Sequence, residues 1–383
     1  MGTTVTLPAK CLCKDWNEYW CIQGIVGENM NPIMARVSLF LILICANLCA
    51  AQDNSGTNSA LRSSGVELQS PEETAPVSHL ATEAPSEKWT ELNAARSGLD
   101  PTQITSTVLA RWDFADYTSE LVRAEWRAND PIELYVVRPH NVVKPPAILY
   151  LYNFPADTDR FKEKAWCEFV TRNGFAAVGF VSALTGQRYH TRPMREWFVS
   201  ELQESLGTTT HDVQMILDYL ASRGDVNVTR IGMLGEGSGG AIAILAAAAD
   251  PRIRFVHAIN PWGDWPDWLK VSAAVPDRER EAYLKPEFVK SLAPLDPVSY
   301  LPQLGSDRIR IEQVAADPIT PGSVQAKIAA CAPSPSSVVQ YPNVRVQIQS
   351  WTAPKGWLEL QLQTASAQAT TAEVNHNIQA LKH

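Results

Sequence analysis

Between residues 121 and 342 the chain alternates short apolar runs with segments of helical periodicity, and this alternation limits the possible folds more than any other feature. A continuous apolar run of four to eight residues is typical of a strand buried on both faces of a sheet. Strands that alternate with helices predict an α/β fold in which helices cover both faces of a mostly parallel sheet. The runs that we interpret as strands are residues 121–126, 132–137, 147–152, 176–181, 231–234, 255–259, 309–314 and 338–341.

The first two runs are separated by Asn129-Asp130, a pair typical of a turn, so we expect an antiparallel β-hairpin at the start of the sheet. Helices are expected over residues 162–172, over a segment that ends near Arg223, and over residues 240–249. The second of these helices has apolar side chains spaced along one face, as a helix packed against a sheet requires.

The N-terminal region carries the pattern of an export signal. Met34 and Arg36 precede an apolar run at 37–45, and small residues follow at 46–51. A basic start, a short apolar core and a small-residue end are typical of a cleaved signal peptide, and the run is too short for a membrane span. We therefore expect a start at Met34 and export to the periplasm or medium, with no stable membrane insertion after cleavage. The alternative is that residues 1–33 form a genuine extension.

Residues 52–105 are rich in Ser, Thr, Ala, Glu and Pro, so we expect a disordered leader before a domain at 106–383. The formal net charge is -8 and no basic run is present, which argues against nucleic acid as a partner. Removal of residues 1–51 would leave only Cys167 and Cys331. The sequence therefore predicts no disulfide framework, no metal site and no cofactor.

The most informative segment runs from residue 212 to residue 253. A helix is followed by the strand at 231–234 and then by the sequence Gly-Glu-Gly-Ser-Gly-Gly at 235–240. This segment resembles the strand–turn–helix of the α/β-hydrolase superfamily, in its branch of exported esterases, dienelactone hydrolases and prolyl-oligopeptidase-like peptidases. The resemblance implies a sharp turn that exposes a nucleophile between flanking glycines, which avoid steric clashes there.

In that family the order is a glycine, any residue, the nucleophile, any residue and two glycines. Gly235 and the pair Gly239-Gly240 set this frame and place Gly237 at the nucleophile position. A shifted frame makes Ser238 the nucleophile, but it loses the upstream glycine and directs the hydroxyl along the helix. Both frames stay open from the sequence alone.

The resemblance also implies an acid and then a histidine after the nucleophile. Asp317 follows the run at 309–314 and matches the acid, although an ordinary Asp-Pro turn is the alternative. No Gly-His follows the run at 338–341, which leaves His190 and His376 as candidate bases. Without a base, a serine hydroxyl is a weak nucleophile.

The same resemblance implies an oxyanion site made by two backbone N–H groups, those of Phe154 and Ser238. Phe154 lies in the loop after the run at 147–152, where the family usually has a glycine-rich turn. Two further histidines look structural, because His211 is placed at the start of a helix and His257 within a buried strand.

The segment at 260–304 is expected to form a cap over the edge of the sheet where the parallel strands end, which is where open α/β sheets bind ligands. Three tryptophans in it could line an apolar pocket or pack as a helical lid. Asp264 and Asp267 could act as a displaced acid or simply begin a helix. The tryptophans are Trp262, Trp265 and Trp268.

Two functions follow from these patterns. The first is a catalytically degenerate α/β-hydrolase-fold protein that keeps a pocket for a small ester, a peptide, a glycan or a partner. The second is an active serine hydrolase acting on ester or peptide bonds, with Ser238 as nucleophile and Asp317 as acid. The glycine at position 237 and the missing Gly-His favour the first hypothesis.

Overall fold

The computed structural model describes residues 87–100, 102, 104–127, 130–154, 158–183, 201–351 and 353–364. The expected signal peptide, with Met34, lies outside the described residues. His190 and His376 also lie outside them, so both stay predictions as bases. Within the part of the chain that the structure describes, no helix is both long enough and apolar enough to cross a membrane.

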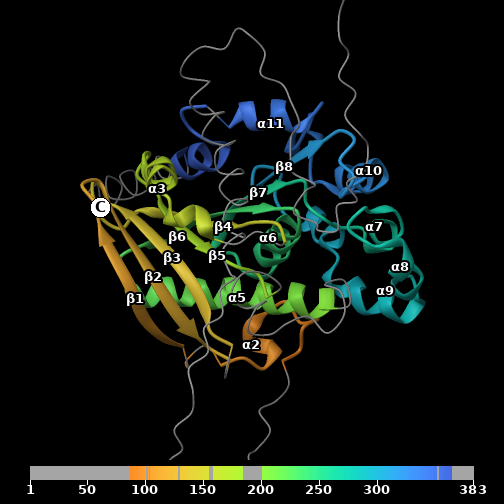
Figure 1. Cartoon of the computed structure of the whole chain (residues 1–383), viewed down its shortest axis with the longest axis horizontal. Helices are drawn as coiled ribbons and strands as arrows, with labels where there is room; N and C mark the ends of the chain where they lie inside the picture. Colours follow the sequence, from red (N-terminus) through yellow and green to blue (C-terminus); the bar gives the residue numbers. More distant parts are fainter. Residues whose placement is uncertain are drawn as a thin grey trace, which may run out of the picture. The chain divides into compact units, whose positions relative to one another are not determined.

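A single nine-stranded sheet runs through the described chain, in the order β1-β2-β3-β5-β4-β6-β7-β8-β9 (Figure 1). β1, β2, β3 and β5 pair antiparallel in that order, and all pairs from β5 to β9 are parallel. The predicted mostly parallel sheet opened by an antiparallel hairpin is therefore confirmed. The strands are β1 Thr105–Asp113, β2 Tyr117–Glu125, β3 Ile132–Pro139, β4 Pro146–Leu151, β5 Ala176–Phe180, β6 Asn227–Glu236, β7 Ile253–Ile259, β8 Ile309–Val314 and β9 Val338–Tyr341.

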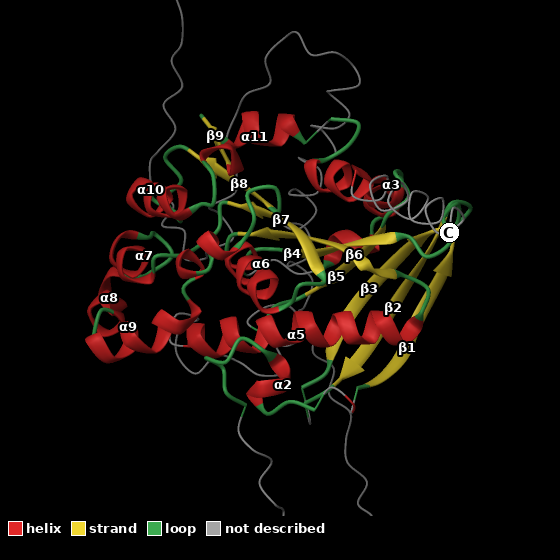
Figure 2. Ribbon diagram, turned by 180° about the vertical axis from the view of Figure 1, so that it is seen from behind, coloured by secondary structure: helices red, strands yellow, loops and turns green. Residues whose placement is uncertain are grey.

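Helices cover both faces of the sheet, as the sequence predicts (Figure 2). On one face α5 (Leu202–Arg223) and α6 (Ser238–Ala249) pack into the larger apolar core. On the other face α3 (Lys164–Thr171) and a helix at 357–364 pack into a smaller core built around Phe161. The central strands are buried on both faces, which explains their continuous apolar sequences.

The remaining helices are short. η3 (Asp159–Lys162) precedes α3, and a run of helices follows β7 in the segment that we expected as a cap. Two more helices flank β9 near the end of the described chain. The helices of the cap segment are α7 Trp265–Val271, α8 Asp277–Tyr283, α9 Pro286–Leu292, η5 Ala293–Leu295, η6 Pro297–Ser299 and η7 Leu301–Gln303. Those around β9 are α10 Gly322–Cys331, η8 Pro335–Ser337 and α11 Val344–Ser350.

Two features of the N-terminal part differ from the expectation. β1 is an additional strand at the edge of the sheet, and it escapes a search for apolar runs because eight of its nine residues are exposed. Residues 87–99, which we placed in a disordered leader, are folded and include the short helix α2 (Ala94–Ser97). The N–H of Ala94 donates to Gln214 Oε1 on α5 at 3.0 Å, and Gln214 Nε2 donates to Leu92 O at 2.7 Å.

A buried ionic network fixes this segment to the domain. Arg127 pairs with both Glu87 and Asp212, and Trp126 Nε1 donates to Asp212 Oδ1 at 3.0 Å. His211 also pairs with Glu87. Burial raises the pKa of Glu87, but the hydrogen bonds and charges of His211 and Arg127 outweigh this effect. The pKa of Glu87 is therefore lower than its ordinary value. The network is a property of the tertiary fold, because Glu87 and Asp212 are far apart in sequence.

We predict that Arg127→Met lowers the free energy of unfolding by about 3–5 kcal/mol, because it leaves the fully buried Asp212 carboxylate without its cation. Urea denaturation of the purified protein measures the change. Arg123→Met is the matched control: its partner is Glu133, the pair is solvent-exposed, and its loss should cost no more than about 1 kcal/mol. Equal effects of the two substitutions would contradict the network's role.

Candidate functional site

The chain turns sharply between β6 and α6, at the edge of the sheet where the parallel strands end. β6 ends at Glu236, α6 begins at Ser238, and Gly237 between them has φ 55° and ψ -114°. This is a backbone conformation that residues with a side chain rarely adopt. The structure therefore places Gly237 at the apex of the turn and Ser238 in the first turn of the helix.

Two flanking glycines are required by close backbone contacts. A Cβ atom on Gly235 would lie 2.2 Å from the carbonyl oxygen of Gly239, and a Cβ atom on Gly239 would lie 2.2 Å from the carbonyl oxygen of Leu151. The glycines at 235 and 239 thus let the strand, the turn and the neighbouring strand β4 approach one another. The strand–turn–helix that the glycine spacing predicted is thus present, with Gly237 between the strand and the helix.

The side chain of Asn153 occupies the space directly above the turn. Asn153 lies two residues after β4, and a Cβ atom built on Gly237 would be only 2.3 Å from Asn153 Oδ1 and 2.5 Å from Asn153 Cγ. A side chain of any size at position 237 therefore overlaps with this asparagine. Gly237 and Asn153 fit each other sterically, and neither can be changed to a larger group independently.

Both backbone donors of the expected oxyanion site already have acceptors within the protein. The N–H of Ser238 donates to Asn153 Oδ1 at 3.0 Å, and the N–H of Phe154 donates to Ser238 Oγ at 3.0 Å. The hydroxyl of Ser238 in turn donates to Asn153 Oδ1 at 3.2 Å, and Ser238 is buried. The structure thus brings Phe154 and Ser238 together, with an amide oxygen of the protein itself bound at the N–H of Ser238.

Two carboxyl groups and a cation lie close to the turn. Burial raises the pKa of Glu236, Arg160 opposes this shift and the carboxylate of Asp317 adds to it. Burial also raises the pKa of Asp317, against two backbone N–H groups that lower it. The guanidinium of Arg160 lies 4.9 Å from the ring centre of Tyr152. Carboxyl groups with raised pKa values can hold and release a proton closer to neutral pH than ordinary ones.

Asp317 lies after β8, where the resemblance places the acid, and the bonds of its side chain are those of a turn. Its Oδ1 accepts the N–H of Ile319 at 2.9 Å. The segment after β9, where the resemblance implies a histidine, instead begins helix α11. Asn343 caps that helix by accepting the N–H of Val346 at 3.0 Å. Among the described residues no histidine reaches Asp317 or Ser238.

The histidines that the structure describes near the core have structural partners. His211 lies in the middle of α5 and not at its start, because the helix begins nine residues earlier than the apolar pattern indicated. His257 on β7 lies with its Nε2 3.0 Å from Glu312 Oε1 on β8. Burial raises the pKa of Glu312, but hydrogen bonds and charge from His257, with donors from Trp351 and Arg310, hold it at about 2.

The three tryptophans of the cap segment pack against one another in the core. Their rings are at most 2% exposed. The rings of Trp262 and Trp268 are 4.7 Å apart, and those of Trp265 and Trp268 are 5.7 Å apart and nearly perpendicular. This is the arrangement of the packed-lid alternative and not of side chains that line an open pocket. Asp264 and Asp267 lie at the start of α7, which matches the alternative that these residues simply begin a helix.

The sequence did not single out Asn153, Glu236 or Arg160, although the structure gathers them around the turn. A polar residue directly after a buried strand was the available signal for Asn153, because such positions lie at the ligand-binding edge of a parallel sheet. Glu236 offered a second signal, since it is an ionisable residue shortly after the apolar run at 231–234.

Comparison with known proteins defines the fold. No protein-family model and no curated protein matches the chain. Among solved structures it is similar to the acetyl xylan esterase from Paenibacillus sp. R4, with a TM-score of 0.53 and 16% identity over 69% of this chain and 90% of that one. Acetyl xylan esterase 1 from Thermoanaerobacterium sp. JW/SL YS485 is similar, with a TM-score of 0.52 and 15% identity over 72% and 95%. The chain has an α/β-hydrolase-like fold.

A peptidase is also similar to the chain. The acylaminoacyl peptidase of Pyrococcus horikoshii matches with a TM-score of 0.44 and 9% identity, over 62% of this chain and 44% of that one. The predicted resemblance to esterases is confirmed at the level of the fold by the two acetyl xylan esterases.

We predict that Gly237→Ala lowers the free energy of unfolding by about 2 kcal/mol or more, because the methyl group overlaps with Asn153 and the backbone at φ 55° becomes strained. The double variant Gly237→Ala with Asn153→Ala should be about 1 kcal/mol more stable than the sum of the two single changes implies. Urea denaturation of all three variants gives this coupling energy.

Gly322→Ala is the control for this cycle, because a Cβ atom at Gly322 would meet nothing within 4 Å. Its stability should stay within about 0.5 kcal/mol of the parent protein. Purely additive effects of the substitutions at 237 and 153 would show that the two residues do not share this space.

Proposed function

We propose that this chain is an exported, catalytically degenerate member of the α/β-hydrolase fold that binds a ligand and does not hydrolyse it. The observation that carries the proposal is the side chain of Asn153, which lies over Gly237 with its Oδ1 on the N–H of Ser238. In an active hydrolase of this fold, the nucleophile's side chain and the substrate's oxyanion would need these two places.

The chemistry at the turn supports the same conclusion. Glycine at position 237 has no nucleophilic atom, and the hydroxyl of Ser238 is hydrogen-bonded to Phe154 and Asn153 instead of to a base. A serine becomes a strong nucleophile only when a base takes its proton. Asn153 Oδ1 lies where an oxyanion would bind, so the oxyanion of a tetrahedral intermediate would first have to displace this amide oxygen.

For the ligand we propose a small ester, a peptide or a glycan. Acetylated xylan, the substrate in the names of the two similar esterases, is the first glycan to test. The carboxyl groups of Glu236 and Asp317 and the guanidinium of Arg160 would give such a ligand polar partners next to the turn. Export rests on the signal-like segment that follows Met34.

The second candidate function is a serine hydrolase that uses Ser238. One observation favours it: the backbone N–H of Phe154 lies beside Ser238 Oγ, and the N–H of Ser238 would become a second oxyanion donor if Asn153 moved away. It also needs a base from outside the described residues, and His190 and His376 are the two candidates. Asp317 would be the acid of this alternative triad.

We predict that the purified protein is not labelled at Ser238 by a fluorophosphonate probe, because none of the residues that the structure describes is a base within reach of the hydroxyl. Intact-mass and peptide mass spectrometry locate any adduct, and a thermal melt shows that the protein is folded. Ser238→Ala is the matched control, and an active serine esterase in the same reaction shows that the probe works. An adduct on Ser238 that disappears in Ser238→Ala would instead establish the second candidate function.

A further inference from the structure

A second candidate site lies at the opposite end of the central strands from the turn at Gly237. A cavity of about 520 Å³ is formed where β1 and β3 end, α5 ends and β6 begins. β6 runs from this cavity to the turn at Gly237, so its ten residues separate the two sites by about 30 Å. The lining residues are Arg111, Asp113, Thr118, Arg138, Pro139, His140, Val142, Val143, Lys144, Gly224 and Asp225.

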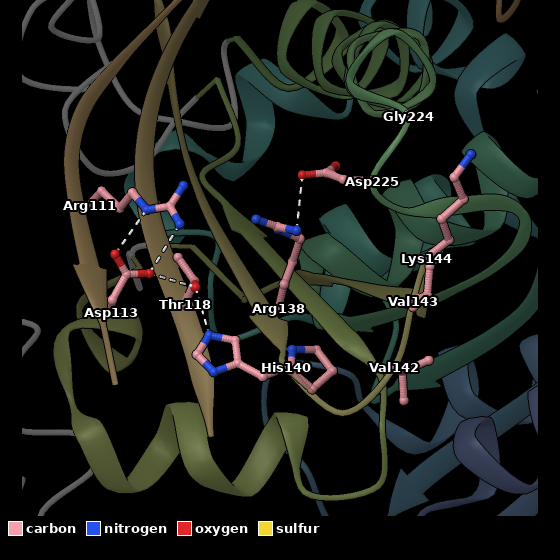
Figure 3. Close-up of a pocket in the computed structure, with 11 residues that line it drawn as sticks. Arg111, Asp113, Thr118, Arg138, His140, Val142, Val143, Lys144, Gly224 and Asp225 are labelled. Atoms are coloured by element: carbon pink, nitrogen blue, oxygen red, sulfur yellow. Dashed lines mark hydrogen bonds and ion pairs between the residues drawn. The ribbon is translucent and has the colours of Figure 1, made fainter. Parts of the chain in front are cut away.

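One side of the cavity is already neutralised by the protein. Arg111 donates to both oxygens of Asp113 at 3.1 Å and to Glu120 Oε1 at 3.1 Å, so its charge is balanced by two carboxylates. Thr118 Oγ1 joins Asp113 to His140 through bonds of 2.8 and 2.9 Å (Figure 3). This chain of bonds holds its four side chains in fixed positions along one wall.

The other side keeps unused donors. Within the part of the chain that the structure describes, Arg138 makes one ion pair, from its Nη1 to Asp225 Oδ2 at 3.2 Å (Figure 3). Asp225 is shared, because it also accepts from Arg223 at 2.7 Å. The Nε of Arg138 is buried and has no hydrogen-bond acceptor among the residues that the structure describes. A buried donor without an acceptor is rare in proteins, so the guanidinium that lines this cavity keeps hydrogen-bonding capacity that the described residues do not use.

Lys144 adds a second cation without an internal partner. It is exposed at the rim of the cavity, and no ion pair or hydrogen bond of its ammonium is found within the described residues. Its backbone is in the left-handed region at φ 50°, which sets the direction of the β3–β4 loop. Counting fixed charges, Arg111, Arg138 and Lys144 face the cavity against Asp113 and Asp225, so the lining carries a net positive charge.

We propose that this cavity binds a ligand through an oxyanion group, a phosphate or a carboxylate, held by Arg138 and Lys144. A guanidinium and an exposed ammonium are donors that proteins use for such groups. The volume lies in the range of small-molecule sites. This site does not depend on the chemistry at Gly237, so it stands or fails separately from the function proposed above.

Isothermal titration calorimetry of the whole chain tests the proposal, with inorganic phosphate in one arm and citrate in the other to separate the two oxyanion types. At least one anion should bind at millimolar concentration or below, and more weakly as sodium chloride is added. Arg138→Gln and Lys144→Gln should each weaken binding by about tenfold. Arg123→Gln, a change of an exposed arginine on β2 that does not line the cavity, should bind as the parent does.

Absence of binding by both anions would overturn the proposal, and so would binding that Arg138→Gln and Lys144→Gln leave unchanged. Lys144 makes no internal bond in the described residues, so its variant reports on binding even if Arg138→Gln disturbs folding. Equal losses in Arg123→Gln and in Lys144→Gln would indicate a general effect of surface charge and would also overturn it.

Discussion

The turn between β6 and α6 is the constraint on which the functional edge of this molecule depends. Gly237 can hold φ 55° without strain, and this conformation lets the chain leave the central strand and enter a helix that is buried along most of its length. The same turn aims the N–H of Ser238 at the end of β4, where Asn153 accepts it. The conformations of β6, the turn at Gly237, α6 and the loop after β4 therefore depend on one another.

The α/β-hydrolase-like fold and the arrangement at the turn rest on different contacts. The fold is maintained by the two cores on either side of the sheet, neither of which needs a nucleophile. At the turn, an amide oxygen stands where an oxyanion would bind, and Asn343 begins a helix where a histidine would be expected. The stability of the fold therefore does not depend on the chemistry at the turn, where Asn153 Oδ1 accepts the N–H of Ser238.

The sequence predicted the features that local pattern controls. Apolar runs located the buried strands, Asn129-Asp130 located the hairpin, and the glycine spacing located the turn at Gly237. The sequence did not predict the features that depend on tertiary contacts. β1 is exposed and carries no apolar alternation, residues 87–99 are ordered by ion pairs with distant partners, and the position of Asn153 over Gly237 depends on how two strands lie side by side.

A crystal structure that resolves the turn and the side chain of Asn153 tests this arrangement. We expect the amide of Asn153 over Gly237, with Oδ1 near 3.0 Å from the N–H nitrogen of Ser238. A side chain of Asn153 directed away from the turn, with a histidine within hydrogen-bond reach of Ser238 Oγ, would contradict it.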